Sequence, residues 1–175
     1  MRNPSTIYLD TSVLFEKMNN VLAQQGVIAL PGNLSIHSLN LKGDATWLYV
    51  VAEVKGPYNG TVIAQCKPGF NNATRRFSIR DFDIQLGEDS FLAKIAGKFV
   101  NSFIADRVDN KLEDVVNEKF MTMLNDIFSQ LRNLSLSGGG TVRFDTKSFN
   151  LHDVHTDIHG LHFVAELTGE ASLEY

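Results

Sequence analysis

The sequence has little that would cross-link the fold, cross a membrane or bind a polyanion. Cys66 is the only cysteine, so no disulfide can form within the chain. No stretch approaches the roughly 20 apolar residues of a spanning helix, and the opening MRNPSTIYLD lacks the apolar core of a secretory signal. A net charge of −4 argues against a nucleic-acid partner, because phosphate contacts need a basic face. The one cationic cluster, Arg75, Arg76 and Arg80, is interpreted as a solvated strand face.

Catalytic signatures are also missing. The segment SGGGT is followed by no lysine and is typical of a hairpin turn, not of a phosphate-binding loop. Asp81 and Asp83 stand two apart on a predicted strand with nothing nearby to separate their pKa values. Cys66 lies in a β segment without an evident histidine partner. We therefore predict no enzyme activity and no cofactor.

The segment LHDVHTDIHGLH, residues 151–162, is the one cluster of metal-ligand residue types. In an extended strand His155, Asp157 and His159 would share one face and offer two imidazoles and a carboxylate to a metal. The sequence supplies neither an evident fourth ligand nor a second shell of partners. We favour solvent-facing histidines on an edge strand, and we assign no metal site.

What the sequence does contain is a regular alternation of helical and β patterns. With 175 residues and 43% hydrophobic content, one domain over residues 1–175 is expected. A short strand at 7–10 precedes a helix over 11–26, capped by Asp10, Thr11 or Ser12. Closely spaced strands with Pro-Gly and Gly-Asp breaks fill 27–86 and predict an antiparallel meander, with a bulge or a sharp bend near Arg80 and Asp81. A long apolar-periodic run over 90–133 predicts either one helix or two helices that meet at 109–110, and strands return after it.

A repeated phrase links the two halves: VAEVKG at 51–56 and VAELTG at 164–169. Each phrase ends a unit in which a helix precedes a meander. We therefore predict two helix-then-meander repeats, spanning 7–86 and 90–175.

The stretch from KGPYNGTVIAQC through RRFSIRDFDIQL, the helical run after it, and LSLSGGGTVRFDT to the end resemble the C-terminal half of a bacterial cell-envelope family of unknown function. They are more loosely similar to YceB-like lipoproteins and to the tubular lipid-binding (TULIP, BPI-like) superfamily. The resemblance implies an α+β fold in which a highly curved antiparallel sheet wraps around a long amphipathic helix. It also implies an apolar groove between helix and sheet, and a periplasmic or cell-envelope location.

The expected function is non-catalytic binding of a lipid or another elongated hydrophobic molecule in that groove. The residues predicted to line it are Phe99, Phe103, Val108, Leu112, Phe120 and Leu124 on the long helix, with Trp47 and Tyr49 on a strand. An apolar stripe at helical spacing is also typical of plain core. The alternative is therefore a structural or protein-interaction module of a larger envelope protein, with a filled core. A membrane surface or an envelope protein is a further expected partner, and nucleic acid is not.

Overall fold

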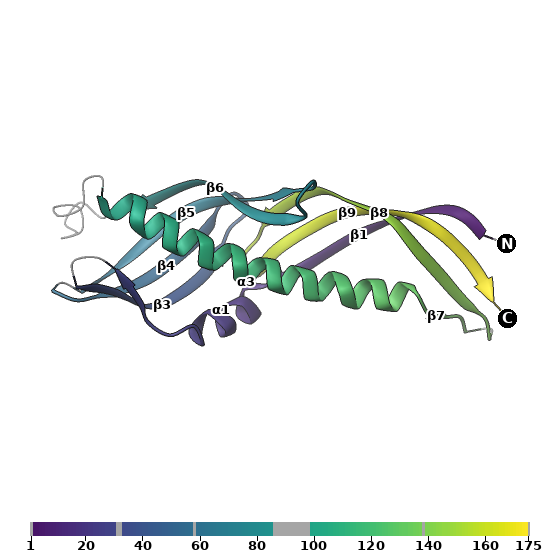
Figure 1. The fold of residues 1–175 in the computed structure, drawn as a ribbon, viewed down its shortest axis with the longest axis horizontal. Coiled ribbons are helices and arrows are strands. Elements are labelled where there is room, and N and C mark those ends of the chain that lie inside the picture. The colour runs from purple at the N-terminus through teal and green to yellow at the C-terminus, as the bar shows by residue number, and fades with distance from the viewer. Residues whose placement is uncertain (1, 31–32, 58, 86–98, 138, 175) are drawn as a thin grey trace.

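The chain forms two antiparallel sheets joined lengthwise by one long helix (Figure 1). The computed structural model describes residues 2–30, 33–57, 59–85, 99–137 and 139–174; at 2, 85, 99–107 and 109 it describes the backbone but not the side chain. Within that part there are nine strands and two helices. The molecule is therefore mostly β and elongated, and both described ends of the chain lie at the same tip.

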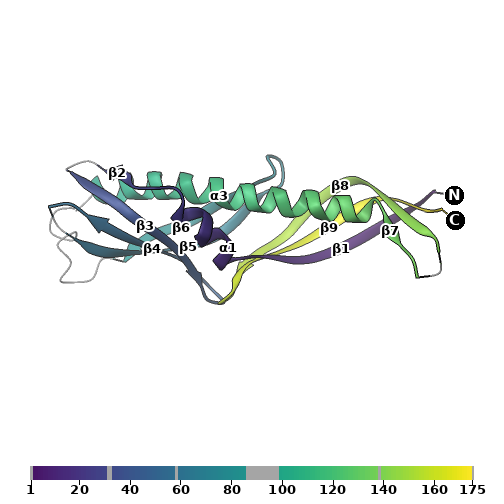
Figure 2. The ribbon, with the colours of Figure 1, turned by 90° about the horizontal axis from the view of Figure 1, so that it is seen from below.

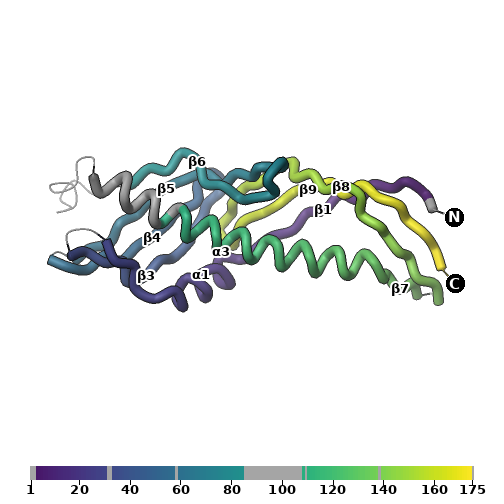
Figure 3. The backbone as a smooth tube through the Cα atoms, viewed as in Figure 1, coloured from purple at the N-terminus to yellow at the C-terminus, as the bar shows by residue number. Residues whose placement is uncertain are grey.

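The four-stranded sheet is built from the two ends of the chain. Its order is β1 (Arg2–Leu14), β9 (Gly160–Glu174), β8 (Thr141–Thr156) and β7 (Leu134–Ser135). Every residue of β1 pairs with β9, from Arg2 opposite Ser172 to Leu14 opposite Gly160, and Figure 3 shows the two strands side by side. Gly160 is needed at that crossing because a Cβ atom there would lie 2.4 Å from the carbonyl oxygen of Val13.

The five-stranded sheet is the predicted meander. Its strands follow chain order: β2 (Ile28–Leu30), β3 (Leu34–Gly43), β4 (Leu48–Lys55), β5 (Gly60–Asn71) and β6 (Arg76–Gln85). Alternate residues of β4 are buried, which matches the period of two in a strand with one covered face. The predicted bulge in β6 is confirmed, because the β5–β6 register shifts there and Asp81 has a φ of 55°.

Helix α1 (Phe15–Ala23) begins later than predicted. Thr11, Ser12 and Val13 continue strand β1, because pairing with β9 outweighs their tendency to cap a helix. The residue before the helix, Leu14, makes no side-chain cap, and the Phe15 N–H instead donates to the His159 carbonyl oxygen at 2.8 Å. Tertiary contacts thus fix the start of α1.

Helix α3 (Phe99–Leu131) runs unbroken through 109–110, so of the two alternatives the continuous helix is confirmed there. The first part of the predicted run, 90–98, lies outside the described residues. Figure 2 shows α3 lying along one side of both sheets. Its buried positions include Val108, Leu112, Val116 and Phe120, whereas Asp114, Glu118 and Met121 on other faces are exposed.

The predicted fold class is wrong. We expected an α+β, TULIP-like fold with one highly curved sheet wrapped around a long amphipathic helix. Among the described residues the strands instead form two separate sheets, and neither encloses α3. The meander ends at β6 because side chains of α3, and not another strand, accept hydrogen bonds from backbone N–H groups on the outer edge of β6. The Phe77 N–H donates to Asn117 Oδ1 at 2.6 Å, and the Ile79 N–H donates to Glu113 Oε1 at 3.2 Å.

The two helix-then-meander repeats are wrong for a related reason. The first strand of the supposed first unit, β1, belongs to the sheet of the second. The helices also differ, since α1 has 9 residues and α3 has 33. The similar phrases 51–56 and 164–169 therefore belong to different sheets. In both strands, β4 and β9, buried residues alternate with more exposed ones.

Three asparagines close sheet edges in the same way, and we call them the asparagine clasps. Each side-chain amide accepts from the N–H and donates to the C=O of one edge residue. Asn19 of α1 bonds Leu41 at 2.6 and 3.0 Å, and Asn117 of α3 bonds Phe77 at 2.6 and 3.4 Å. Asn72, in the β5–β6 turn, bonds Leu151 of β8 at 2.8 and 2.9 Å.

The Asn72 clasp links the two sheets, and a second polar link joins them elsewhere. In the other, the Thr156 hydroxyl at the end of β8 donates to the carbonyl oxygens of Asp44 and Trp47 in the β3–β4 turn. One continuous apolar core includes residues of both sheets and both helices. No helix within the described ranges is both long and apolar enough to cross a membrane.

We predict that Asn117→Ala lowers the free energy of unfolding by about 1–2 kcal/mol, because it leaves the partly buried N–H and C=O of Phe77 without their partner. Urea unfolding followed by circular dichroism measures the change. Asn125→Ala is the matched control, since Asn125 is exposed on the same helix and alanine favours the helical state. Equal effects of the two substitutions would show that the Asn117 clasp contributes nothing.

Candidate functional site

Four of the predicted groove residues lie together inside the core. Val108, Leu112, Phe120 and Leu124 are between 0 and 4% exposed along one stripe of α3. Phe99 and Phe103 belong to the same helix, but their side chains lie outside the described part of the chain. The described stripe therefore packs against the sheets and lines no open groove.

Trp47 and Tyr49 lie apart from that stripe. Leu48 and Val50 point into the core, so the alternation of β4 turns the side chains of Trp47 and Tyr49 to the other face of the sheet. The ammonium of Lys67 lies 4.7 Å from the centre of the Trp47 ring.

The Tyr49 hydroxyl donates to Asp44 Oδ2 at 2.8 Å, while Asp44 Oδ1 accepts from the N–H groups of Trp47 and Thr46. The N–H of Trp47 above all, then that of Thr46 and the Tyr49 hydroxyl, lower the pKa of Asp44. The bond to Asp44 raises the pKa of Tyr49. This polar arrangement serves the β3–β4 turn and places these two residues outside any groove along α3.

An aromatic cluster fills the junction between α3 and the two sheets. Its rings are Phe70, Phe120, Phe128, Phe149 and Phe163, from β5, α3, β8 and β9. The ring of Phe120 lies 4.5 Å from that of Phe163 and 5.2 Å from that of Phe70, centre to centre. Such spacings are those of rings in contact. These rings therefore fill the space between Phe120 of α3 and the sheets.

Open space lies instead beside the C-terminal half of α3, in what we call the β1–α3 cleft. Its volume is about 400 Å³. Its lining residues are Thr11, Ser12 and Val13 of β1, Lys17 of α1, and Lys119, Thr122, Met123, Asp126, Ile127 and Gln130 of α3.

The cleft has an apolar floor and a polar rim. Met123 and Ile127 are half-buried, Val13 is buried, and the Thr11 hydroxyl donates to the Met123 sulfur at 3.3 Å. Lys17 and Asp126 are exposed. This arrangement suits an apolar chain with a polar end.

The sequence did not reveal the cleft. Met123 and Ile127 belong to the apolar run of α3, but they sit at its margin, where half-buried positions cannot be told from core positions. Thr11, Ser12 and Val13 were assigned to a helix. The pairing of β1 with β9, which puts them beside α3, joins residues from opposite ends of the chain, such as Val13 and Leu161, and leaves no local signal.

The histidine-rich segment forms a stacked pair and a turn. His155 and His162 face each other across β8 and β9, with ring centres 5.2 Å apart and planes 8° from parallel. His155 Nδ1 lies 2.7 Å from Asp153 Oδ2. Asp157 and His159 lie in the turn between the strands, so the predicted shared face does not form. No group of three or more potential metal ligands occurs among the described residues.

Asp157 is the anchor of that turn. Its Oδ1 accepts from the N–H groups of His159 and Gly160 at 2.6 and 2.9 Å. Its Oδ2 lies 3.0 Å from His162 Nε2, an ion-pair distance without the alignment of a hydrogen bond. The N–H of His159 above all, with that of Gly160 and the His162 ring, lowers the pKa of Asp157 to about 2 against the opposing effect of desolvation.

Comparison with known proteins gives one match. A family model described as "Domain of unknown function (DUF4403)" matches residues 1–175. No curated protein and no solved structure matches the chain. The expected membership of a family of unknown function is confirmed, whereas the finer similarity to YceB-like lipoproteins and to the TULIP superfamily receives no support.

We predict that acid removes the contribution of Asp157 to stability. Because its pKa in the fold, about 2, is below the ordinary 3.8, the contribution is complete above the ordinary pKa and is lost as the pH falls through about 2. Asp157→Asn should therefore unfold at a lower temperature than the wild type at neutral pH, and the gap should narrow toward pH 2. Thermal unfolding across this range measures it. A gap that stays constant down to pH 2 would contradict the assignment.

Proposed function

The chain belongs to the family described as Domain of unknown function (DUF4403), and we propose that it binds a lipid or another elongated apolar molecule without acting on it chemically. The ligand lies in the β1–α3 cleft, beside α3 and not beneath it. The mechanism is sequestration of apolar surface from water.

One observation carries the proposal: the cleft combines a volume of about 400 Å³ with an apolar floor and a polar rim. Pockets that hold small molecules are typically about 300–1,000 Å³, mostly apolar, with a few polar groups that orient the ligand. Each CH₂ group that leaves water contributes about 0.8 kcal/mol. Met123 and Ile127 supply the floor, and Lys17 and Lys119 lie where a polar end would emerge.

The ligand class and a periplasmic or cell-envelope location are carried over from what the sequence resemblance implied, and they are part of this proposal. The proposal takes nothing about the fold from that similarity. A membrane surface or an envelope protein is then the natural source of the ligand.

A second candidate is a structural or protein-interaction module without a ligand. The observation that favours it is the aromatic cluster, because Phe120 and Phe163 are both 0% exposed and occupy the space that a groove beneath α3 would need. The two candidates differ in whether the β1–α3 cleft takes up an apolar molecule.

We predict that Thr122→Trp abolishes binding of the uncharged fluorophore 1-N-phenylnaphthylamine, since the indole fills the cleft from an exposed position whose hydroxyl bonds only the preceding turn. The expected loss of affinity is at least about tenfold, equivalent to about 1.4 kcal/mol. Fluorescence titration measures it. Met121→Trp is the matched control: it adds the same ring at the neighbouring position, which is 41% exposed and outside the cleft.

A second pair of variants separates a blocked cleft from a disturbed helix. Ile127→Asp puts a charge on the cleft floor, whereas Asn125→Asp adds the same charge at an exposed position. Weakened binding in Ile127→Asp alone supports the proposal. If the fluorophore binds all four variants and the wild type equally, or binds none of them, the filled module replaces the ligand-binding proposal.

A further inference from the structure

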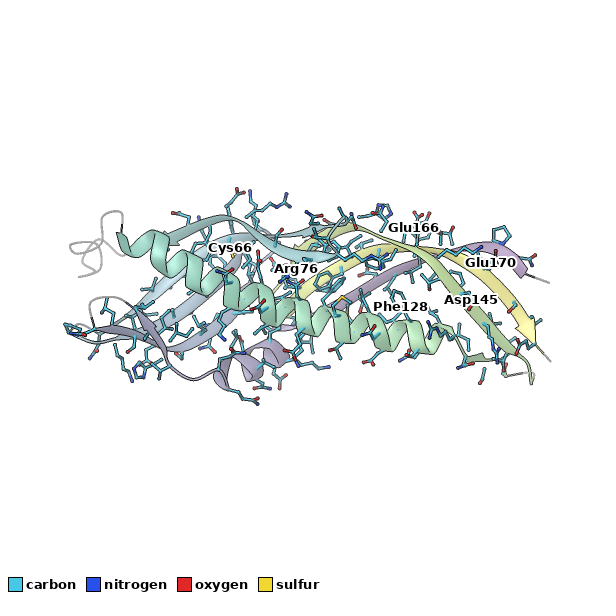
Figure 4. The ribbon with its side chains drawn as sticks, viewed as in Figure 1. Cys66, Arg76, Phe128, Asp145, Glu166 and Glu170 are labelled. Atoms are coloured by element: carbon cyan, nitrogen blue, oxygen red, sulfur yellow. The ribbon has the colours of Figure 1, made fainter. Side chains whose placement is uncertain are left out.

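A second cavity, which we call the arginine cavity, lies on the other side of α3 from the β1–α3 cleft. Its volume is about 260 Å³. The residues that line it are Arg75 of the β5–β6 turn, Phe128 of α3, Arg132 just beyond α3, and Asp145, Thr146, Lys147, Ser148 and Phe149 of β8. Figure 4 labels Phe128 on the C-terminal half of α3 and Asp145 on the neighbouring β8.

The walls of the cavity are held by features already described. Asn72 stands three residues before Arg75, and its clasp fixes the β5–β6 turn to Leu151 of β8. Arg75 itself has a φ of 54°, which turns the chain sharply at that point. The β8–β9 register shifts between Thr146 and Ser148. Lys147 is the extra residue there, and its ammonium pairs with Glu170.

Two guanidinium groups remain to act on a ligand. Neither Arg75 nor Arg132 pairs with a carboxylate in the part of the chain that the structure describes, whereas the adjacent Arg76 lies 3.5 Å from Asp114 of α3. Arg75 and Arg76, both predicted to lie on a solvated strand face, thus have different environments. A guanidinium presents a planar fork of N–H donors that matches the two oxygens of a carboxylate.

The remaining groups define the rest of the ligand. Phe128 and Phe149 are half-buried, with ring centres 6.4 Å apart and planes at 82°, and they offer an apolar floor. Asp145 adds one negative charge to the lining that contains the two arginines. Two positive charges against one negative charge favour a ligand with a single negative charge over a polyanion.

We propose that the arginine cavity binds a small amphiphilic monoanion. Arg75 and Arg132 hold its carboxylate, and its apolar body lies on Phe128 and Phe149. This site is separate from the β1–α3 cleft and does not depend on the function proposed above.

The test uses 4-phenylbutyrate as the probe and the uncharged 4-phenylbutan-1-ol as its match, added to the full chain at low ionic strength, where exposed charges are least screened. Backbone amide shifts of Phe128, Ser148 and Phe149 report binding by NMR. Arg75→Gln and Arg132→Gln should each weaken binding of the anion about fivefold or more, and Asp145→Asn should tighten it about twofold to fivefold. Arg76→Gln, which removes the same charge outside the cavity, should leave binding unchanged.

The alcohol separates charge recognition from apolar contact. It should bind more weakly than the anion, and equally to the wild type and to Arg132→Gln. The proposal is overturned if 4-phenylbutyrate fails to shift these amides, if Arg76→Gln weakens it as much as Arg132→Gln does, or if Asp145→Asn does not tighten it. These outcomes are independent of fluorophore binding in the β1–α3 cleft.

Discussion

The structure depends on closing the open edges of two sheets. An edge strand exposes a row of N–H and C=O groups that must find partners or stay in water. Here the partners at three edge positions are single asparagine side chains, which reproduce the two bonds of a neighbouring strand at Leu41, Phe77 and Leu151. Two of these clasps attach helices to the five-stranded sheet, and the third attaches one sheet to the other. Of the three, the Asn117 clasp holds α3 against β6.

A fixed α3 decides where a ligand can lie. With Asn117 bonded to β6 and Phe120 packed against rings from β5, β8 and β9, the space beneath this part of the helix is occupied. Among the described residues, open space lies at its two flanks, beside β1 and beside β8. One flank is floored by aliphatic side chains with lysines at the rim, and the other by aromatic rings with arginines at the rim. The two flanks therefore suit different ligands. Each flank combines side chains of α3 with side chains of a strand.

Local patterns in the sequence predicted the elements better than their assembly. The apolar run of α3 and the bulge at Asp81 each depend on neighbouring residues, and each was recognised. The pairing of β1 with β9 joins the two ends of the chain, and no short segment records it. Because of this pairing, residues 11–13 form a strand where a helix was predicted, and the predicted repeat does not occur. The candidate site was missed for the same reason, because both flanks of α3 combine strands that are distant in sequence, and an asparagine that closes a sheet edge looks like any polar residue of a helix or turn.

Hydrogen exchange of the Leu41, Phe77 and Leu151 amides tests the account most directly. All three N–H groups donate to asparagine Oδ1 atoms at 2.6 to 2.8 Å, so the account predicts that they exchange as slowly as amides inside the β4–β5 ladder. It also predicts that Phe77 keeps this protection when the β1–α3 cleft is occupied, since the ligand does not displace the helix. Fast exchange at Leu151 or Phe77 in the free protein would contradict the claim that the clasps fix α3 and join the sheets.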